Sequence, residues 1–107
     1  MKFSLDCELI ERLDSGFIEE LEKKYLTNEI ITIIEDEEFL STINAFFAND
    51  LNITKTSQSA FMHRNTLVYR LNKIKKLSGL DLRNFEDATT FKMLICIYEK
   101  QKAKKGE

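Results

Sequence analysis

The sequence predicts a single all-α domain of about four helices, preceded by short N-terminal helices. Three observations support this fold class. The 107 residues suit one domain and include no proline, where average usage would give about five. Apolar residues recur at spacings of three and four, the period of an α-helix. Side chains that cap helices stand before several of these apolar runs.

The first third of the chain contains the apolar spacing of three short helices. Leucines at every fourth position, 5, 9 and 13, predict a helix that ends at residues 14–16. Ser15 can then cap a second helix, with an apolar stripe formed by Phe17, Ile18, Leu21 and Tyr25. The β-branched run 30–34 is compatible with a strand, but positions 26, 30, 33 and 34 fit helical spacing, and we favour a helix.

A longer helix is predicted from Asp36 to Asn49. Asp36 and the two glutamates after it suit a helix start, where carboxylates accept hydrogen bonds from free amides and oppose the positive end of the helix dipole. The core-facing stripe is wide and consists of Phe39, Leu40, Ile43, Phe46 and Phe47.

Two helices joined by a short turn follow. Thr54 is placed to cap a short helix from Lys55 to Phe61, and His63 is placed to cap a second helix from about Arg64 to Leu77. Gly79 stands where a left-handed residue commonly ends a helix. Leu67, Leu71 and Ile74 share one face of the second helix. The opposite face carries Asn65, Tyr69, Asn72, Lys73 and Lys76.

The last helix begins at a cap formed by Asn84, with Asp87 three residues later. Its stripe is Phe91, Leu94, Ile95 and Tyr98, but residues 93–98 are apolar on every side. Such a helix is buried on more than one face, so either the N-terminal helices or another subunit should cover it. Residues 100–107 are polar, and we expect a frayed tail.

Charge is distributed unevenly along the chain. Residues 1–40 carry 4 basic and 12 acidic side chains, whereas residues 41–80 carry 6 and 1, and residues 81–107 carry 6 and 5. The net charge of −2 therefore conceals a basic middle beside a strongly acidic first third. Such a basic block is commonly a solvated helix face without a partner. Whether it instead binds a partner depends on which predicted helices carry the charges.

The basic block coincides with the short helix, the turn and the longer amphipathic helix, an arrangement typical of a helix-turn-helix. The helix 64–77 would then enter the major groove of double-stranded DNA, with its first-turn amides attracting phosphate. The residues predicted to contact DNA are Arg64, Asn65, Thr66, Tyr69, Arg70, Lys73 and Lys76.

Several of these residues also have a purely structural interpretation. His63 is better explained as a helix cap than as a residue that reads a base. Arg70 lies at the edge of the apolar stripe, where a salt bridge inside the domain competes with a phosphate contact. Tyr69 could be a partly buried ring, and the lysines could simply be solvated.

The segment Ser57 to Leu82, SQSAFMHRNTLVYRLNKIKKLSGLDL, resembles the C-terminal helix-turn-helix of PucR-type regulators of sugar-diacid and purine catabolism. The residues that carry the resemblance are the block 63–67, followed by Tyr69-Arg70-Leu71 and Ser78-Gly79. It extends over roughly 60 residues, from Asp36 to about Tyr98, and it implies a DNA-binding module with helix 64–77 as the recognition helix. The Fis-like helix-turn-helix is similar at a greater distance.

This sequence departs from the family pattern in two respects. Ser57 stands where the family usually has alanine, and Ala60 stands where it has a larger aliphatic residue, so looser packing of the first helix is expected. Family members also carry a large sensory region upstream, whereas about 35 residues precede the module here. Control by a small-molecule effector is therefore not predicted.

We expect three parts. Residues 1–35 form an acidic helical segment that either mediates dimerisation or masks the basic helix. Residues 36–99 form the helix-turn-helix domain, and residues 100–107 form the frayed tail. No cofactor or metal site is predicted, because the chain has one histidine and its cysteines, at 7 and 96, lack metal-ligand spacing. With three glycines and no phosphate-binding loop, an enzyme is not expected either. The absence of a signal peptide or an apolar span of about 20 residues predicts a cytoplasmic protein without membrane contact.

The leading prediction is a DNA-binding transcriptional regulator that acts as a homodimer, because one recognition helix alone gives modest affinity at physiological salt. The alternative is a non-enzymatic protein-interaction module that keeps the fold and binds a protein partner through its acidic N-terminal segment. Binding to DNA at low salt distinguishes the two.

Overall fold

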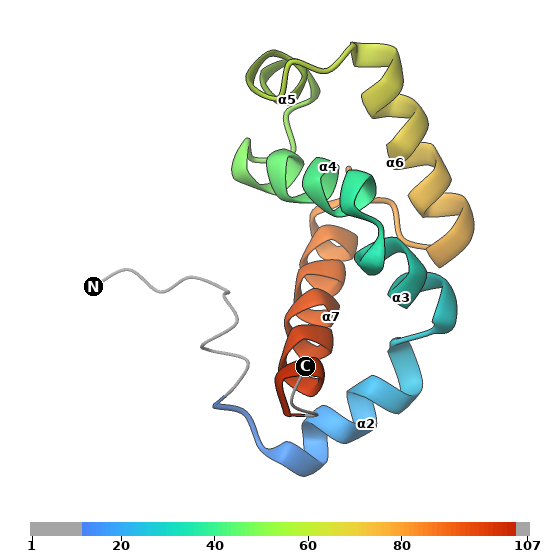
Figure 1. Cartoon of the computed structure of the whole chain (residues 1–107), viewed down its shortest axis with the longest axis vertical. Helices are drawn as coiled ribbons and strands as arrows, with labels where there is room; N and C mark the ends of the chain where they lie inside the picture. Colours follow the sequence, from blue (N-terminus) through green and yellow to red (C-terminus); the bar gives the residue numbers. More distant parts are fainter. Residues whose placement is uncertain (1–11, 105–107) are drawn as a thin grey trace.

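The computed structural model describes residues 12–104, which form six α-helices and, within that range, no strand (Figure 1). The helices are α2 (Ser15–Tyr25), α3 (Asn28–Glu35), α4 (Glu37–Ala48), α5 (Ile53–Ser59), α6 (Arg64–Ser78) and α7 (Phe85–Lys104). The all-α prediction is confirmed, including a helix in place of a strand at 30–34. The helix predicted through Leu5 and Leu9 lies outside the described residues.

Side-chain caps fix where most helices start. Asp36 accepts a hydrogen bond from the Phe39 amide (3.1 Å), and Asn84 accepts one from the Asp87 amide (3.2 Å), as predicted. The prediction that Ser15 caps α2 is wrong. Asp14 takes that role by accepting from the Phe17 amide (3.1 Å), because it stands at the three-residue separation that this bond requires.

The core lies between α7 and the other helices. In Figure 1, α7 runs along the long axis of the molecule, with α4 across its N-terminal half and α2 near its C-terminal end. Helix α3 packs against both α4 and α6, and α2 packs against α7. Three isoleucines of α3 and one phenylalanine from each of α4 and α7 are almost fully buried: Ile30, Ile33, Ile34, Phe46 and Phe91.

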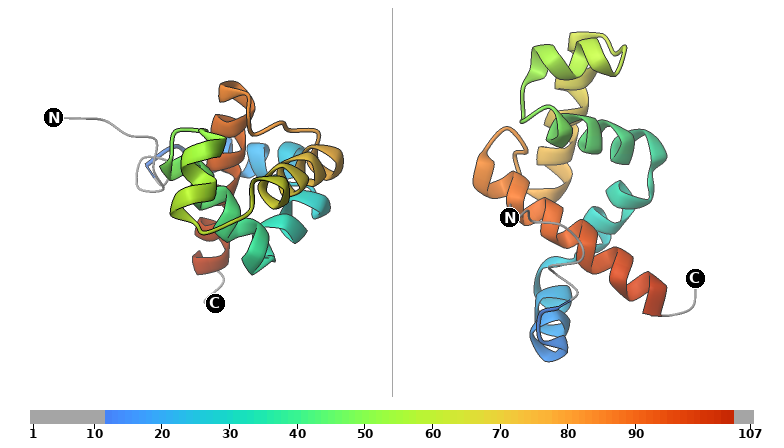
Figure 2. Two further views of the ribbon diagram at one scale, coloured as in Figure 1. Left: turned by 90° about the horizontal axis from the view of Figure 1, so that it is seen from above. Right: turned by 90° about the vertical axis from the view of Figure 1, so that its left-hand side faces the viewer.

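The prediction that α7 is buried on several faces is confirmed, since Leu94, Ile95, Cys96 and Ile97 are all at most 3% exposed. The N-terminal helices are one of the two elements expected to cover α7. In the structure α2 packs on α7, and Ile18 of α2 is buried. The predicted stripe of α2 is only partly buried, because Phe17 and Tyr25 remain over 40% exposed. A helix at one end of the molecule has a single neighbour to cover its apolar side, as the right-hand view of Figure 2 shows for α2.

Helix α7 continues to Lys104, past residue 100, where the polar tail begins in the sequence. The residues after Tyr98 are good helix formers, and neither glycine nor proline interrupts them before residue 106. No helix within residues 12–104 combines the length and the apolar character that a bilayer crossing requires.

Candidate nucleic-acid interface

The helix-turn-helix is formed by α5, the turn at 60–63 and α6, with α4 packed against both helices. Helix α5 begins two residues earlier than predicted, because Asn52 rather than Thr54 is its cap and accepts from the Lys55 amide (2.8 Å). The chain enters α5 through two residues with positive φ, Asp50 and Leu51. That sharp turn delivers Asn52 in the extended conformation that a capping residue needs.

Both predicted ends of α6 are confirmed. His63 Nδ1 accepts a hydrogen bond from the Asn65 amide (3.1 Å), so the cap explains this histidine. At the other end Gly79 has φ of 80°, and its amide donates to the Lys75 carbonyl (2.8 Å). Only glycine adopts this conformation at little cost, so the helix ends where a glycine is available.

The two faces of α6 separate as the apolar spacing predicts. Leu67, Leu71 and Ile74 are completely buried and anchor the helix against the core. The opposite face is exposed to solvent along its length: Asn65, Tyr69, Asn72, Lys73 and Lys76. No acidic residue occurs between 51 and 80, so the outer face carries cations and neutral polar groups only.

At its N-terminal end α6 is joined to the start of α5. The exposed Arg64 guanidinium donates to the Thr54 hydroxyl (3.3 Å), so this arginine connects the N-terminal ends of α5 and α6. Asn65 is exposed and Thr66 is half-buried. Together with the free amides of the first turn, these residues form a polar, cationic end suited to phosphate or base edges.

Tyr69 is exposed on the outer face rather than buried. Its side chain is 61% exposed, and the Lys73 ammonium lies 5.9 Å from the centre of its ring. That distance is within the range of a cation–π contact, which holds the two side chains on one surface. The ring and the ammonium thus form an amphipathic pair one turn apart on α6.

Arg70 is tied into the domain, as the intramolecular alternative describes. Its guanidinium donates to the Thr42 hydroxyl at 2.8 Å and lies 3.4 Å from the Glu38 carboxylate. The Thr42 side chain is fully buried and donates in turn to the Glu38 carbonyl (2.8 Å). The Arg70 side chain is only 22% exposed and connects α6 to α4.

A second polar network fixes the C-terminal half of α6. Arg83 donates to the Asn72 side-chain oxygen (2.9 Å) and to Asp81 (2.8 Å), while the Lys75 ammonium lies 3.8 Å from Asp81. The hydrogen bond from Arg83 holds the pKa of Asp81 below its ordinary value, with its charge and that of Lys75 acting in the same direction. Asn72 is therefore oriented by a partner within the chain.

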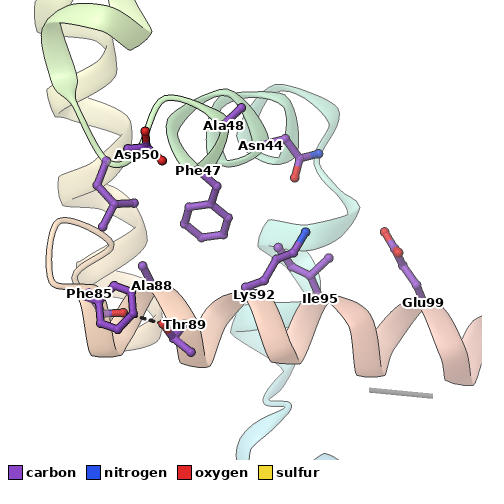
Figure 3. Close-up of a pocket in the computed structure, with 11 residues that line it drawn as sticks. Asn44, Phe47, Ala48, Asp50, Phe85, Ala88, Thr89, Lys92, Ile95 and Glu99 are labelled. Carbon is purple, nitrogen blue, oxygen red and sulfur yellow. Dashed lines mark hydrogen bonds between the residues drawn. The ribbon is translucent and has the colours of Figure 1, made fainter. Parts of the chain in front are cut away.

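An open groove of about 870 Å³ lies between α4 and α7 (Figure 3). Phe47 and Phe85 form its apolar part, and Lys92 and Glu99 stand along its α7 side. None of the residues that line it comes from α6, so the groove and the outer face of α6 are separate surfaces. Among residues 12–104, no group of His, Cys, Asp and Glu is arranged to hold a metal ion.

Sequence reasoning missed the residues that support the interface rather than form it. Thr42, Thr54 and Arg83 each bond to a residue of α6 from another element. The bonded residues are separated in the sequence by 28, 10 and 11 positions, respectively. Helical periodicity does not predict contacts at these separations. Only the placement of Arg70 at the edge of the stripe indicates a partner within the domain, and it does not indicate which element supplies that partner.

Comparison with known proteins places the module within a family. The model of the PucR C-terminal helix-turn-helix domain matches residues 39–95. The chain is 52% identical over 46 residues to the carbohydrate diacid regulator of Escherichia coli, which covers 43% of this chain and 12% of that protein. It is 32% identical over 63 residues to the purine catabolism regulatory protein of Bacillus subtilis, covering 59% of this chain and 12% of the relative.

A third relative is the transcriptional activator PmfR of Paenarthrobacter nicotinovorans, 35% identical over 65 residues, with 61% of this chain and 13% of the relative covered. The matches span about an eighth of the length of these three proteins. No solved structure matches the chain. Because the family model covers more than half of the 107 residues and coincides with α4 to α7, the chain belongs to the PucR C-terminal helix-turn-helix domain family.

Proposed function

We propose that this chain is a DNA-binding module of a transcriptional regulator and that α6 is its recognition helix in the major groove. One observation carries the proposal: α6 is anchored by three fully buried side chains, while its opposite face is exposed and free of acidic groups. A helix with its side chains is about 10–12 Å across, which matches a major groove about 12 Å wide. The relatives named as regulators support the same function.

The contacts divide by chemistry. Arg64, Lys73 and Lys76 are exposed cations suited to phosphate, while Asn65 and Tyr69 present hydrogen-bonding groups to base edges. Thr66 is half-buried in the first turn of α6, and we assign it a contact at that end of the helix. For Arg70 we propose a phosphate contact beside its bond to Thr42, with the phosphate displacing the exposed Glu38 carboxylate.

We further propose that the protein acts as a homodimer. A recognition helix with five or six phosphate contacts binds weakly at physiological salt, whereas two half-sites about 34 Å apart raise both affinity and specificity. The buried residues of α7 already pack within the chain. A dimer contact must therefore use surface that remains exposed, and sedimentation at increasing protein concentration measures whether the mass doubles.

The decisive experiment is an electrophoretic mobility shift with random and genomic duplex DNA at low salt. Retardation of duplex, stronger than that of single strands of the same length, supports the proposal because a helix in the major groove requires a duplex. A chain that retards no DNA at 50 mM salt contradicts it. That result would favour the protein-interaction alternative.

The chemistry expected at this surface is binding without catalysis. Its groups are cations, amides and hydroxyls, which suit the binding of a polyanion. Incubation of supercoiled and linear DNA with the protein and Mg²⁺, followed by electrophoresis, tests this point. Intact DNA is the expected result, and nicking or cleavage would contradict it.

A further inference from the structure

The turn between α5 and α6 contains a large apolar side chain at a position that suits glycine. The Met62 amide donates to the Ser57 carbonyl (2.9 Å), and the Phe61 amide donates to the Gln58 carbonyl (3.3 Å). These two bonds form the Schellman pattern that ends many helices, with Phe61 as its left-handed residue at φ of 51°. The turn itself gives no reason for an aromatic residue, because glycine adopts this conformation with less strain.

The ring of Phe61 also takes no part in the packing of the domain. It is 96% exposed, more than any other large apolar side chain among the described residues. The neighbouring Met62 packs against the hydrophobic core. The turn therefore directs one apolar side chain inward and leaves the other fully in water, where an isolated ring gains nothing for folding.

The position of Phe61 relative to the proposed interface indicates what could cover the ring. It precedes the His63 cap by two residues and the exposed Arg64 by three. The bond from Arg64 to Thr54 brings the start of α5 to the same end of the molecule, which is the upper end in Figure 1. Phe61 thus lies in the turn that leads directly to the cationic and amide groups that the proposed function assigns to DNA.

We propose that Phe61 is an apolar DNA contact at the edge of the major groove. Its ring packs against the C5 methyl group of a thymine, or against deoxyribose carbons, beside the nucleotide that Arg64 contacts. Phosphate contacts carry no sequence information, whereas an apolar contact to a thymine methyl distinguishes this base from cytosine. This inference rests on the proposed function and adds a residue of a different chemical class to it.

The test uses the full chain and a duplex enriched from a random pool by the wild-type protein. Phe61→Gly removes the ring and relieves the backbone, so this variant should fold at least as well as the wild type. We expect its affinity for the enriched duplex to fall by about fivefold to tenfold, the loss of one good apolar contact. The slope of affinity against salt should not change, because no charge is removed.

Two controls sharpen the comparison. Phe17→Ala removes an exposed ring from α2, at the opposite end of the molecule, and should leave the affinity unchanged. Replacing each thymine of the duplex in turn by deoxyuridine removes single methyl groups. A position that weakens wild-type binding but not that of Phe61→Gly identifies a methyl contact, whereas loss in the protein variant alone identifies deoxyribose carbons.

The outcomes separate this inference from the function on which it rests. A wild-type chain that enriches no duplex contradicts the proposed function and the inference with it. A wild-type chain that binds while Phe61→Gly binds equally well contradicts the inference alone. If Phe61→Gly sediments as a smaller species than the wild type, the ring contacts a second copy of the chain and the DNA contact is wrong. Phe61→Asn, which also suits a left-handed position, repeats the test should the glycine variant lose its circular-dichroism spectrum.

Discussion

Removing two cations from the outer face of α6 should flatten the salt dependence of DNA binding by a predictable amount. Arg64 and Lys73 are exposed, and each is assigned one phosphate. Each phosphate contact contributes about 0.9 to the slope of log affinity against log salt, so Arg64→Ala with Lys73→Ala should lower the slope by about 1.8. Between 50 and 200 mM salt, two contacts account for about a 12-fold change in affinity. With six contacts for each bound protomer, wild-type affinity per protomer falls about 1,800-fold over this range, and that of the variant falls about 150-fold.

The double variant should remain folded, because neither side chain belongs to the core. Arg64 loses one exposed hydrogen bond to Thr54, and Lys73 loses its contact with the Tyr69 ring. Contacts of these kinds at exposed sites contribute about 0.5–1.5 kcal/mol each at most. A circular-dichroism spectrum equal to that of the wild type therefore separates lost contacts from lost structure.

The assay is fluorescence anisotropy of a labelled random duplex, titrated at several salt concentrations between 50 and 200 mM. The matched control is Lys23→Ala with Lys24→Ala, which removes two positive charges from the last turn of α2. We expect the control to keep the wild-type slope, because α2 does not form part of the proposed interface. An unchanged slope in the α6 variant, or an equal decrease in the control, would refute the assignment of the contact face.

Three further predictions concern the elements that hold α6 in place. Gly79→Ala should lower the free energy of unfolding by about 1 kcal/mol in urea titrations, because the added methyl group meets no atom within 4 Å and only the positive φ opposes it. Arg70→Met should cost about 1–2 kcal/mol by the same measurement, since the buried Thr42 hydroxyl loses a charged donor; equal stability would show that the bond is dispensable. Asp81→Asn should destabilise the protein at pH 7 and progressively less below pH 4. The folded pKa of Asp81 lies below its ordinary value of 3.8, so its stabilising effect is complete above that value and is lost as the pH falls through the folded pKa. A difference between the two proteins that does not change with pH would contradict this account.

The ends of α6 could be predicted from the sequence because their signals are local. A cap acts within three residues, and a left-handed glycine ends the helix that immediately precedes it, so His63 and Gly79 could be identified by position alone. The burial of Leu67, Leu71 and Ile74 follows equally from one period. For the same reason the errors at Ser15 and Thr54 are small, because two candidate caps stood close together and the geometry of the preceding turn selected between them.

What the sequence could not predict depends on contacts between distant elements. The bond between Arg70 and Thr42 joins positions 28 apart, and the exposure of Phe61 follows from a left-handed turn that non-glycine residues seldom adopt. Whether α2 or a second subunit covers α7 also had no local signal, because an apolar face indicates only that some cover exists. Periodicity thus identifies the face that is buried, and tertiary packing decides what buries it.

The acidic first third of the chain bears on DNA binding through its position. A mask that swings over the outer face of α6 would have to release α3, whose isoleucines 30, 33 and 34 are at most 3% exposed and share one core with α4 and α6. Exposing three such side chains costs roughly 4.5–9 kcal/mol, a large part of the stability of a small domain. The carboxylates of α3 and of the start of α4 therefore stay at fixed positions beside α6 and do not move over its outer face. A fixed negative surface next to a cationic helix repels a polyanion from one side, so under the proposed function we expect DNA to approach α6 from its outer face.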